Sequence, residues 1–349
     1  MKLDYQPQVL VETGNLSRED WLAYRRKGIG GSDVAAVLGV SPFRTARDLY
    51  YDYYDKLGIA APVVSDDNWV QLEVGNLLEP LVARIFDKKT GLKVYQRKAM
   101  FYHPEYPWML ADLDYLVDLP DGTTAILEIK TTNYNARDNW WYNGQEIVPL
   151  YYDTQGRHYM CVMNIDRVYY CCLYGNSEDE AIIRQLDRDM DYEDELIALE
   201  DTFWHENVLA QSPPPYTEDG DLIMESLRRW LGPSEKDTPP VQFSLPQYQL
   251  IRRYEELQEE KKRFDADVKA IDAELGRVKA QIIAAMGTSS SAVYDTGDGG
   301  YKVTYNPMRK SGISKENLER LKAVHPDIYD EYVTTQISRR FSIKQTKAV

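Results

Sequence analysis

The sequence predicts a mixed α/β fold, in which helices flank a central mixed sheet and a long helical arm follows toward the C-terminus. Three observations support this class. Residues 108–133 alternate apolar and polar side chains on both sides of a Pro-Asp-Gly turn, which is typical of a β-hairpin. Residues 69–89 carry an apolar stripe at helical spacing, as expected for a helix packed on a sheet. Residues 250–285 carry a heptad repeat of apolar side chains, which is typical of a coiled coil.

The hairpin turn determines which residues face one another. The loop at 120–122 ends in a glycine that can adopt a positive φ, which is a favoured hairpin geometry. This loop places Leu119 opposite Thr123, and counting back along both strands places Asp114 opposite Glu128. Directly opposed residues have Cβ atoms about 5 Å apart, so the two carboxylates converge.

Lys130 follows Glu128 with one residue between them, so it projects from the same face of the hairpin. Two carboxylates and an ammonium at one strand end make a suitable site for a hard divalent cation and a nearby water. The alternative is a half-exposed hairpin whose outer face happens to be charged. Leu116 and Ile126 flank the carboxylates on that face, and this favours a site, because a solvated face rarely places acids between apolar neighbours.

Near the N-terminus, two helices are predicted around a glycine-rich turn. Residues 17–27 have the pattern of a capped helix, with acids in the first turn and cations, including Arg25, toward the end. Residues 28–33, GIGGSD, precede a second helix that ends at Gly39. Glycines before a helix, with Ser32 near its start, can form a backbone nest for a phosphate. A plain glycine-rich turn with a serine cap is the alternative.

Further elements follow on both sides of the hairpin. Before it we expect a helix at 41–58, a polar loop at 61–68, a helix from Trp69 to Lys89 and a strand at 92–103 that joins the hairpin. After it we expect an Asn- and aromatic-rich loop at 131–152, a helix containing 153–164, a strand at 167–176 and a long amphipathic helix at 177–210. Glu79 lies inside the apolar stripe of its helix and needs a partner, which a cation at the hairpin would provide. Gln155 and Tyr159 share one face of their helix.

The C-terminal third is dominated by the heptad repeat. The apolar residues at its two repeat positions, here called the seam, are Leu250, Leu257, Phe264, Ile271, Val278 and Ala285, with Tyr254, Val268, Leu275 and Ile282. Lys261 interrupts the seam. A single helix packed on its own domain is the alternative to a coiled coil. A hairpin at 292–305, a helix at 314–323 and a basic end at 337–347 complete the chain.

The charge is distributed unevenly along the chain. Overall there are 41 Lys and Arg against 56 Asp and Glu, which by composition alone argues against a nucleic-acid-binding protein. Residues 101–250 hold 9 basic and 28 acidic side chains, whereas residues 1–100 hold 14 and 13, and residues 301–349 hold 10 and 5. An acidic middle can contain a metal site and leave both ends free to contact phosphates.

Cysteine usage and hydropathy indicate the compartment. Cys161, Cys171 and Cys172 have no metal-ligand spacing and are expected to be buried thiols in a reducing environment. The sequence has no apolar run long enough to span a bilayer and no signal-peptide pattern. We therefore expect a soluble cytoplasmic protein without a membrane partner.

Five motifs in this order, GIGGSDVAAVLGVSP, GNLLEP, ADLDYLV, AILEIKTT and QGRHYM, resemble the YqaJ family of phage recombination exonucleases. These are relatives of lambda exonuclease in the PD-(D/E)XK nuclease superfamily. The resemblance covers residues 17–176, and the arm and tail are similar to those of phage-encoded members. It implies a restriction-endonuclease-like core and four segments: a nuclease domain at 1–211, a linker with a short helix at 212–245, a coiled-coil arm at 246–287 and a hairpin-helix region at 288–349.

The family's motifs assign roles to residues of this chain. Asp114 and Glu128 would be metal ligands, assisted by the Ile129 carbonyl and by Glu79, and Lys130 would orient or activate the attacking water. In addition, Gln155 and Tyr159 would line the DNA groove, and Arg25 and Ser32 would grip a terminal 5′ phosphate.

This sequence departs from the family pattern at three positions. Leu113 precedes Asp114 where the superfamily name has proline, and Tyr115 follows where glycine is usual. Asp112 lies opposite Lys130 in the expected register and could pair with it. None of these departures removes a metal ligand.

The activity that the resemblance implies is a metal-dependent 5′→3′ double-strand DNA exonuclease that leaves 3′ single-stranded tails. Mg²⁺ is the expected cofactor, with Mn²⁺ as a substitute, and hydrolysis is in-line without a covalent intermediate. The expected partners are double-stranded DNA ends, a phage single-strand annealing protein and further copies of this chain through residues 246–287. The alternatives are an endonuclease or junction resolvase of the same fold, and an inactive DNA-binding scaffold.

Overall fold

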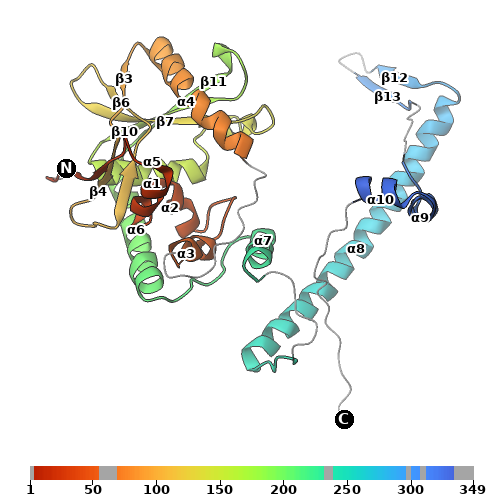
Figure 1. Cartoon of the computed structure of the whole chain (residues 1–349). Coiled ribbons are helices and arrows are strands. Elements are labelled where there is room, and N and C mark those ends of the chain that lie inside the picture. The colour runs from red at the N-terminus through yellow and green to blue at the C-terminus, as the bar shows by residue number, and fades with distance from the viewer. Residues whose placement is uncertain (1–3, 55–68, 232–238, 296–299, 307–311, 334–349) are drawn as a thin grey trace. The chain divides into compact units, whose positions relative to one another are not determined.

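The computed structural model describes residues 4–54, 69–231, 239–295, 300–306 and 312–333 (Figure 1). The chain forms two compact units, Met1–Gly232 and Pro233–Val349. Mixed sheets packed between helices form the first unit, as the sequence predicts.

Two sheets make up the centre of the first unit. The five-stranded sheet has the order β11-β10-β7-β6-β3 and consists of β3 (Lys93–Tyr95), β6 (Tyr115–Asp118), β7 (Thr124–Thr131), β10 (Arg167–Leu173) and β11 (Ala181–Asp187). The four-stranded sheet has the order β1-β4-β5-β2 and consists of β1 (Gln8–Glu12), β2 (Ile29–Gly30), β4 (Ala99–Tyr102) and β5 (Met109–Asp112). Both sheets are mixed, because β7 pairs with β10 and β2 pairs with β5 in parallel.

The first arm of the predicted hairpin is divided between the two sheets. It breaks at Leu113 and Asp114, so that β5 pairs with β4 whereas β6 pairs with β7. The predicted strand 92–103 is divided in the same way into β3, which does join the hairpin, and β4, which does not. Apolar residues occur on both sides of each break, so the sequence pattern alone does not reveal where the chain changes sheet.

Seven α-helices are described in the first unit. They are α1 (Arg18–Arg25), α2 (Gly31–Val37), α3 (Ala46–Tyr54), α4 (Trp69–Thr90), α5 (Leu150–Met163), α6 (Met190–Thr202) and α7 (Gly220–Leu231). The first five confirm predicted helices, and the Ser17 side chain caps α1 by accepting from the backbone N–H of Asp20. The predicted end at Gly58 and the loop 61–68 lie outside the described residues. Within the predicted loop 131–152 lie a short 3₁₀ helix (Arg137–Trp140) and the two-residue strands β8 (Trp141–Tyr142) and β9 (Gln145–Glu146).

The predicted long helix at 177–210 is wrong in its first third. Ser177 does interact with Glu180, but around a short 3₁₀ turn, and residues 181–187 form β11. This edge strand pairs along its whole length with β10, most of which is buried. Pairing with a buried neighbour therefore outweighs the helical propensity of this segment. The helical part comprises α6 and a π-helical turn at Phe203–Leu209.

Both faces of the three central strands of the five-stranded sheet, β6, β7 and β10, are largely buried. On one face Leu116 and Ile126 pack into a cluster that includes Met160 of α5, and on the other face Val117 and Leu127 pack with Phe86 of α4. The hairpin is thus held between α4 and α5, which rigidly positions the residues at its open end.

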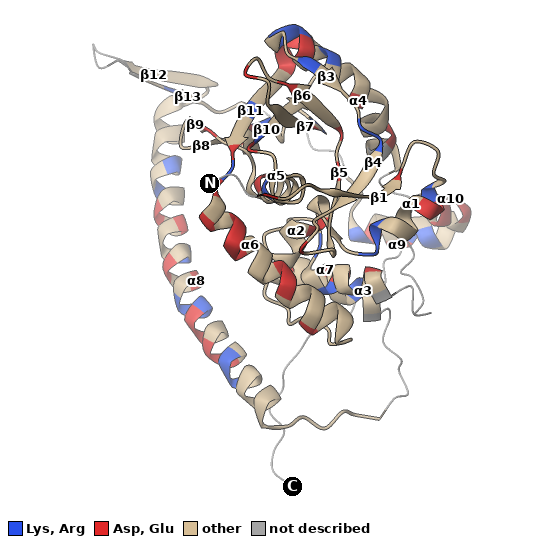
Figure 2. Cartoon of the chain, turned by 90° about the vertical axis from the view of Figure 1, so that its left-hand side faces the viewer, with Lys and Arg blue, Asp and Glu red and all other residues tan. Residues whose placement is uncertain are grey.

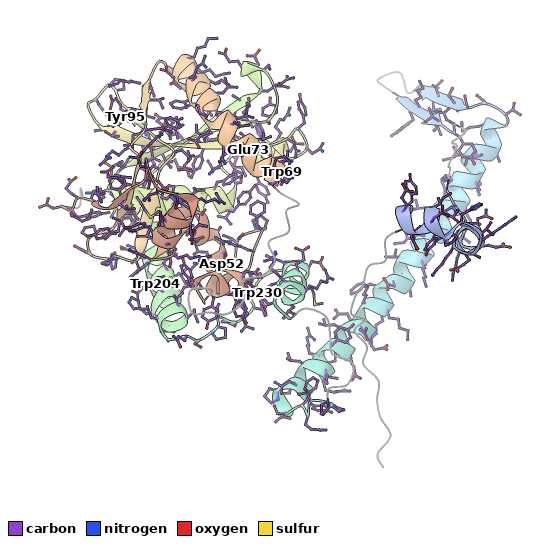
Figure 3. The ribbon with its side chains drawn as sticks, in the orientation of Figure 1. Asp52, Trp69, Glu73, Tyr95, Trp204 and Trp230 are labelled. Carbon is purple, nitrogen blue, oxygen red and sulfur yellow. The ribbon has the colours of Figure 1, made fainter. Side chains whose placement is uncertain are left out.

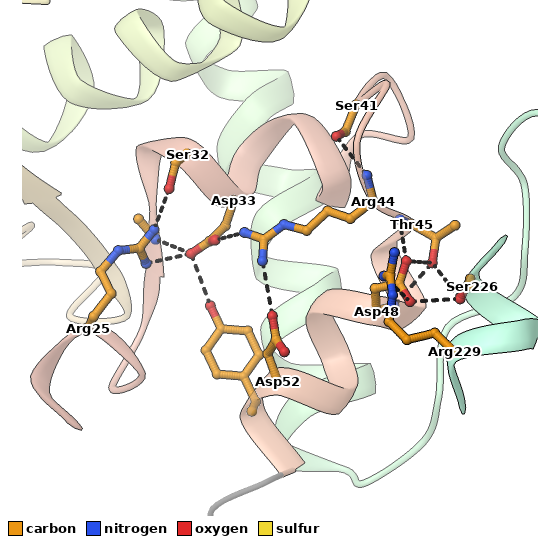
Figure 4. A network of polar contacts seen from close by, with 12 residues as sticks. Arg25, Ser32, Asp33, Ser41, Arg44, Thr45, Asp48, Asp52, Ser226 and Arg229 are labelled. Atoms are coloured by element: carbon orange, nitrogen blue, oxygen red, sulfur yellow. Dashed lines mark hydrogen bonds and ion pairs between the residues drawn. The ribbon is translucent and has the colours of Figure 1, made fainter. Parts of the chain in front are cut away.

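Helix α7 belongs to the first unit, although the sequence analysis placed it in the linker 212–245. The Oδ1 atom of Asp48 on α3 accepts hydrogen bonds from Ser226 Oγ (2.8 Å) and Trp230 Nε1 (2.5 Å) and pairs with Arg229 Nη1 (3.1 Å; Figure 4). Burial raises the pKa of Asp48, but its hydrogen bonds and Arg229 outweigh burial and lower it. The first unit is therefore longer than the predicted domain 1–211.

The second unit is dominated by one helix. It contains α8 (Leu245–Met286), the antiparallel strands β12 (Ser291–Asp295) and β13 (Gly300–Thr304), α9 (Lys315–Val324) and α10 (Pro326–Tyr332). This confirms the predicted hairpin strands and the helix near 314–323; the hairpin turn and the basic end 337–347 lie outside the described residues. No residue of α8 is buried, and Lys and Arg alternate with Asp and Glu along it (Figure 2). Among the described helices of both units, none is long and apolar enough to cross a membrane.

Candidate active site

Asp114 lies at the bend where the chain passes from one sheet to the other. The register of β6 and β7 pairs Tyr115 with Leu127, so the next pair in line is Asp114 and Glu128, and the predicted opposition of the two acids is confirmed. The Oδ2 atom of Asp114 accepts a hydrogen bond of 2.8 Å from the backbone N–H of Ile129.

Glu128 is almost fully buried, with 1% of its surface exposed. Its Oε2 atom accepts hydrogen bonds of 3.0 Å from Lys130 Nζ and from Gln155 Nε2. Its Oε1 atom is also buried and has no hydrogen-bond partner among the described residues. Burial, followed by the nearby Asp114 carboxylate, raises the pKa of Glu128 to about 8. A buried carboxylate oxygen without a donor is unfavourable, and a bound cation would relieve it.

Lys130 is held between Glu128 and Gln155. Its Nζ atom donates a hydrogen bond of 3.0 Å to Gln155 Oε1 and lies 4.8 Å from the ring centroid of Tyr152. Burial lowers the pKa of Lys130, but the Glu128 and Asp114 carboxylates outweigh burial and raise it. The two carboxylates therefore favour the charged form of Lys130.

The expected pairing of Asp112 with Lys130 is wrong. Asp112 lies in β5, opposite Met100 of β4, and accepts a hydrogen bond of 2.6 Å from Trp21 Nε1. The reason is the break at residue 113, which takes Asp112 out of the sheet that contains Lys130.

Helix α5 brings Gln155 and Tyr159 to the same face, as the sequence predicts, with 3.4 Å between Gln155 Nε2 and the Tyr159 hydroxyl. The Tyr159 ring packs against Gly31 at the start of α2. A Cβ atom at Gly31 would lie 2.5 Å from a carbon of that ring, so a glycine is required for this approach.

A pocket of about 270 Å³ opens beside Asp114 and Tyr159, whereas Glu128, Lys130 and Gln155 are not in its lining. Its lining includes Glu79, Asp114 and Tyr159 together with Arg25 and Ser32. Glu79 is half-buried on α4 and accepts a hydrogen bond of 3.3 Å from Gln96 Nε2. Burial, and then the Asp114 carboxylate, raise the pKa of Glu79 to about 7. The structure thus brings together residues that are far apart in the sequence.

The predicted phosphate-binding pair, Arg25 and Ser32, lies at one side of this pocket. Arg25 Nη2 donates a hydrogen bond of 2.9 Å to Ser32 Oγ, and the same guanidinium forms an ion pair with Asp33 (Figure 4). The backbone of Gly30 lies against the guanidinium, because a Cβ atom there would be 2.3 Å from Arg25 Cζ.

Sequence reasoning missed Asp33 and Arg44. Asp33 is 5% exposed, and its two carboxylate oxygens pair with Arg25 and Arg44 (Figure 4). Burial raises the pKa of Asp33, but the two guanidiniums outweigh burial and lower it. The one available signal was an acid directly after Ser32 in the first turn of a helix, and that position is common for acids without any further role.

The acids at the hairpin suit a metal ion that takes only one or two ligands from the protein. Among the residues that the structure describes, no three His, Cys, Asp or Glu side chains form a group that could hold a metal. Glu79 therefore shares a pocket with Asp114 without completing a three-acid cluster. Mg²⁺ needs only one or two protein carboxylates, because it retains several waters and also binds substrate phosphates. Asp114 and Glu128, with its unpartnered Oε1, fit that requirement, and the roles of all the site residues remain predictions.

The fold and the site together define a class of protein. A mixed sheet that carries two acids and a lysine on one hairpin, followed by a helix that leads to a parallel strand, is the restriction-endonuclease-like arrangement. The model of the YqaJ-like viral recombinase domain matches residues 20–166. The protein YqaJ of Bacillus subtilis (strain 168), itself uncharacterised, is 30% identical over 350 residues, which cover 97% of this chain and 98% of the relative. This chain belongs to the YqaJ family.

Several solved structures are similar to part of this chain. The alkaline exonuclease LHK-Exo of Laribacter hongkongensis matches with a TM-score of 0.45 and 20% identity, over 56% of this chain and 94% of that chain. Its complex with dAMP matches with the same TM-score and identity over 60% and 96%. A phage-related exonuclease of Haemophilus somnus 129PT matches with a TM-score of 0.38 and 14% identity, over 53% and 96%.

Proposed function

We propose that this chain is a metal-dependent exonuclease that degrades one strand of double-stranded DNA from the 5′ end and leaves a 3′ single-stranded tail. The observation that carries the proposal is the unpartnered, buried Oε1 atom of Glu128, beside Asp114 and with Lys130 on the other carboxylate oxygen. Membership of a viral recombinase family supports a role for this nuclease in recombination.

In this proposal the cofactor is Mg²⁺, which Mn²⁺ can replace, and Asp114 and Glu128 bind it with help from the Ile129 carbonyl and Glu79. When bound, the metal stabilises negative charge on the phosphoryl oxygens and favours ionisation of a nearby water. The neighbouring carboxylates favour the charged form of Lys130, so in this proposal it donates a hydrogen bond that orients the attacking water. Tyr159 and Gln155 line the path of the DNA strand.

The proposed partners follow from the same function. The chain would act on DNA ends in the cytoplasm of a bacterial host and deliver the 3′ tail to a phage single-strand annealing protein.

A duplex labelled at either end tests the proposal. With Mg²⁺, linear DNA should lose its 5′ label as mononucleotides before the 3′ label, and a chelator should stop the reaction. Cuts within circular duplex DNA would instead indicate an endonuclease or resolvase. DNA binding without any metal-dependent release of nucleotides would indicate an inactive scaffold.

We propose that Arg25 and Ser32 bind the terminal 5′ phosphate. Replacing Arg25 with Lys, or Ser32 with Ala, is expected to reduce the preference for 5′-phosphorylated over unphosphorylated ends by about tenfold, because each change removes a charge-assisted hydrogen bond. The measurement is the ratio of initial rates on the two substrates. Arg18→Ala, at an exposed position of the same helix, is the control and should leave the ratio unchanged. A ratio that stays at the wild-type value in the first two variants would exclude this role.

We also propose that the chain forms a homo-oligomer through the seam of residues 246–287. Seam residues are widely exposed in the single chain, including Leu250 at 69%, Phe264 at 63% and Leu275 at 61%. Burying each such side chain contributes roughly 1.5–3 kcal/mol, so association with further copies is favourable. Lys261 can remain in the seam if its stem lies along the core and its amine reaches solvent or Glu260 of a neighbouring copy.

Light scattering measures the assembly directly. The full-length protein should be an oligomer at micromolar concentration, whereas a truncation ending at Pro240 should be smaller and still cut DNA. The double change Leu257→Asp and Ile271→Asp should dissociate the oligomer, and Lys269→Asp, outside the seam, should not. A monomeric full-length protein would contradict the proposal.

A further inference from the structure

A second and larger cavity of the first unit adjoins the candidate active site. It has a volume of about 1030 Å³ and lies between the N-terminal turns of α4, the segment that follows β7 and the start of α5. Trp69 and Glu73 mark those turns of α4 in Figure 3. We call this cavity the aromatic groove, and its lining includes Phe43, Thr131, Trp141, Tyr142 and Tyr152.

Residues that line the aromatic groove directly adjoin residues of the candidate active site along the chain. Leu78 lines the groove, and the next residue of α4, Glu79, lines the smaller pocket with Asp114. On β7, Thr131 lines the groove directly after Lys130. The Tyr152 ring, which is also in the lining, lies 4.8 Å from Lys130 Nζ.

A row of aromatic rings runs through the groove toward Lys130. Phe43 contacts Tyr151 edge to face, with 5.4 Å between ring centroids, and Tyr151 contacts Tyr152 at 4.4 Å. The outer rings are open to solvent, because Phe43 is 66% and Tyr142 is 67% exposed. Exposed aromatic rings provide a surface on which bases can stack, and Phe43 is held in place by its contact with Tyr151.

Polar groups of a particular kind accompany these rings. Arg137 is outside the lining: its guanidinium lies 5.6 Å from the ring of Trp141, and its Nε atom pairs with Oδ1 of Asp138 (3.5 Å), which does line the groove. The exposed amide side chains of Gln71, Asn133 and Asn139 also line the groove. Rings for stacking and amides for base edges together match unpaired nucleotides. They do not match a duplex, whose base faces are already stacked on one another.

We propose that the aromatic groove binds the unpaired bases of a single DNA strand next to the phosphodiester held at Asp114 and Glu128. This inference rests on the proposed nuclease function and specifies the form of its substrate. The strand would separate from its complement before it reaches the metal site, and its bases would stack on Phe43 and Tyr142.

The test measures binding without cleavage. The full-length protein, in buffer with a chelator, is titrated into a fluorescein-labelled oligothymidylate, and anisotropy gives the dissociation constant. The double change Phe43→Ala and Tyr142→Ala should weaken binding by roughly tenfold or more, because losing the stacking of even one base on an aromatic ring has about that effect. Tyr142→Phe keeps the ring and should bind like the wild type.

Tyr134→Ala is the matched control. Tyr134 is 60% exposed and lies, like Tyr142, between β7 and α5, but it is outside the groove lining and packs on Tyr174. Thermal unfolding of each variant shows whether it is folded. If the wild type does not bind the oligothymidylate, or if the double variant binds as tightly as Tyr134→Ala, the inference is wrong.

This outcome is separate from that of the nuclease assay. If the protein releases no nucleotides but its binding of the oligothymidylate depends on Phe43 and Tyr142, the proposed nuclease activity is wrong and the role of the aromatic groove is supported. If the protein cleaves DNA with metal but binds the oligothymidylate equally well without these rings, the nuclease activity is supported and the role of the groove is wrong.

Discussion

Replacing Glu128 with Gln, or Asp114 with Asn, is expected to abolish cleavage of duplex DNA while leaving the fold and DNA binding largely intact. Each change keeps the side-chain volume and removes the charge that would hold the metal. Loss of a single electrostatic group at a reaction centre lowers kcat by about a hundredfold to a thousandfold, and loss of a ligand should reach at least that range. Initial rates at saturating Mg²⁺ measure the effect, and near-normal turnover in either variant would mean that the site lies elsewhere.

Stability provides an independent measurement on the Glu128→Gln variant. The pKa of Glu128 is raised from a reference value of 4.5 to about 8 without metal. A group with a raised pKa contributes stability that is fully present below the reference pKa and is lost as pH rises through about 8. In a chelator, the wild type should therefore lose more stability than the variant between acidic and alkaline pH. Glu73→Gln, at an exposed position of α4, is the control and should behave like the wild type.

The second large effect is expected from Lys130. Lys130→Met keeps most of the stem and removes the ammonium that donates to Glu128 and Gln155. Cleavage should fall by about a hundredfold or more, because the ammonium that would orient the attacking water is removed. Binding of Mn²⁺, measured by calorimetry, should be retained, since both acids remain.

A combined change separates this role from simple charge balance. If Lys130 served only to neutralise Asp112, replacing both residues would restore activity. Asp112 lies in the other sheet and accepts a hydrogen bond from Trp21 of α1, so we expect no recovery in the double variant Asp112→Asn and Lys130→Met. Recovery would show that the ammonium has no direct part in the reaction.

The acid pair could be predicted because its geometry is local. The turn at 120–122 determines the register, and the backbone N–H of Leu119 does bond to the carbonyl of Thr123 at 2.9 Å. The change of sheet at residue 113 could not be predicted, because it depends on which distant strands are available for pairing. β11 was missed for the same reason, since its conformation depends on β10 rather than on its own side chains.

The surroundings of Arg25 show a different limit of sequence reasoning. The family motif indicates Arg25 and Ser32, but the contact of Asp33 with Arg44 joins helix α2 to the loop that follows it. Neither residue has a spacing that sets it apart from an ordinary surface charge. The aromatic groove could not be predicted from the sequence either, because its rings come from three separate stretches of the chain.

Asp48 and α7 have a consequence for how the protein is made. Asp48 is separated from Ser226 by 178 positions and from Trp230 by 182, so it leaves the ribosome long before these partners. Until α7 has been synthesised, Asp48 lacks most of the donors that satisfy its charge, and the surface that α7 covers remains open. Contacts between such distant positions form late and slowly. The nuclease unit therefore completes its folding only after nearly two thirds of the chain has been translated, and a nascent chain stalled before α7 would be a target for chaperones or proteases.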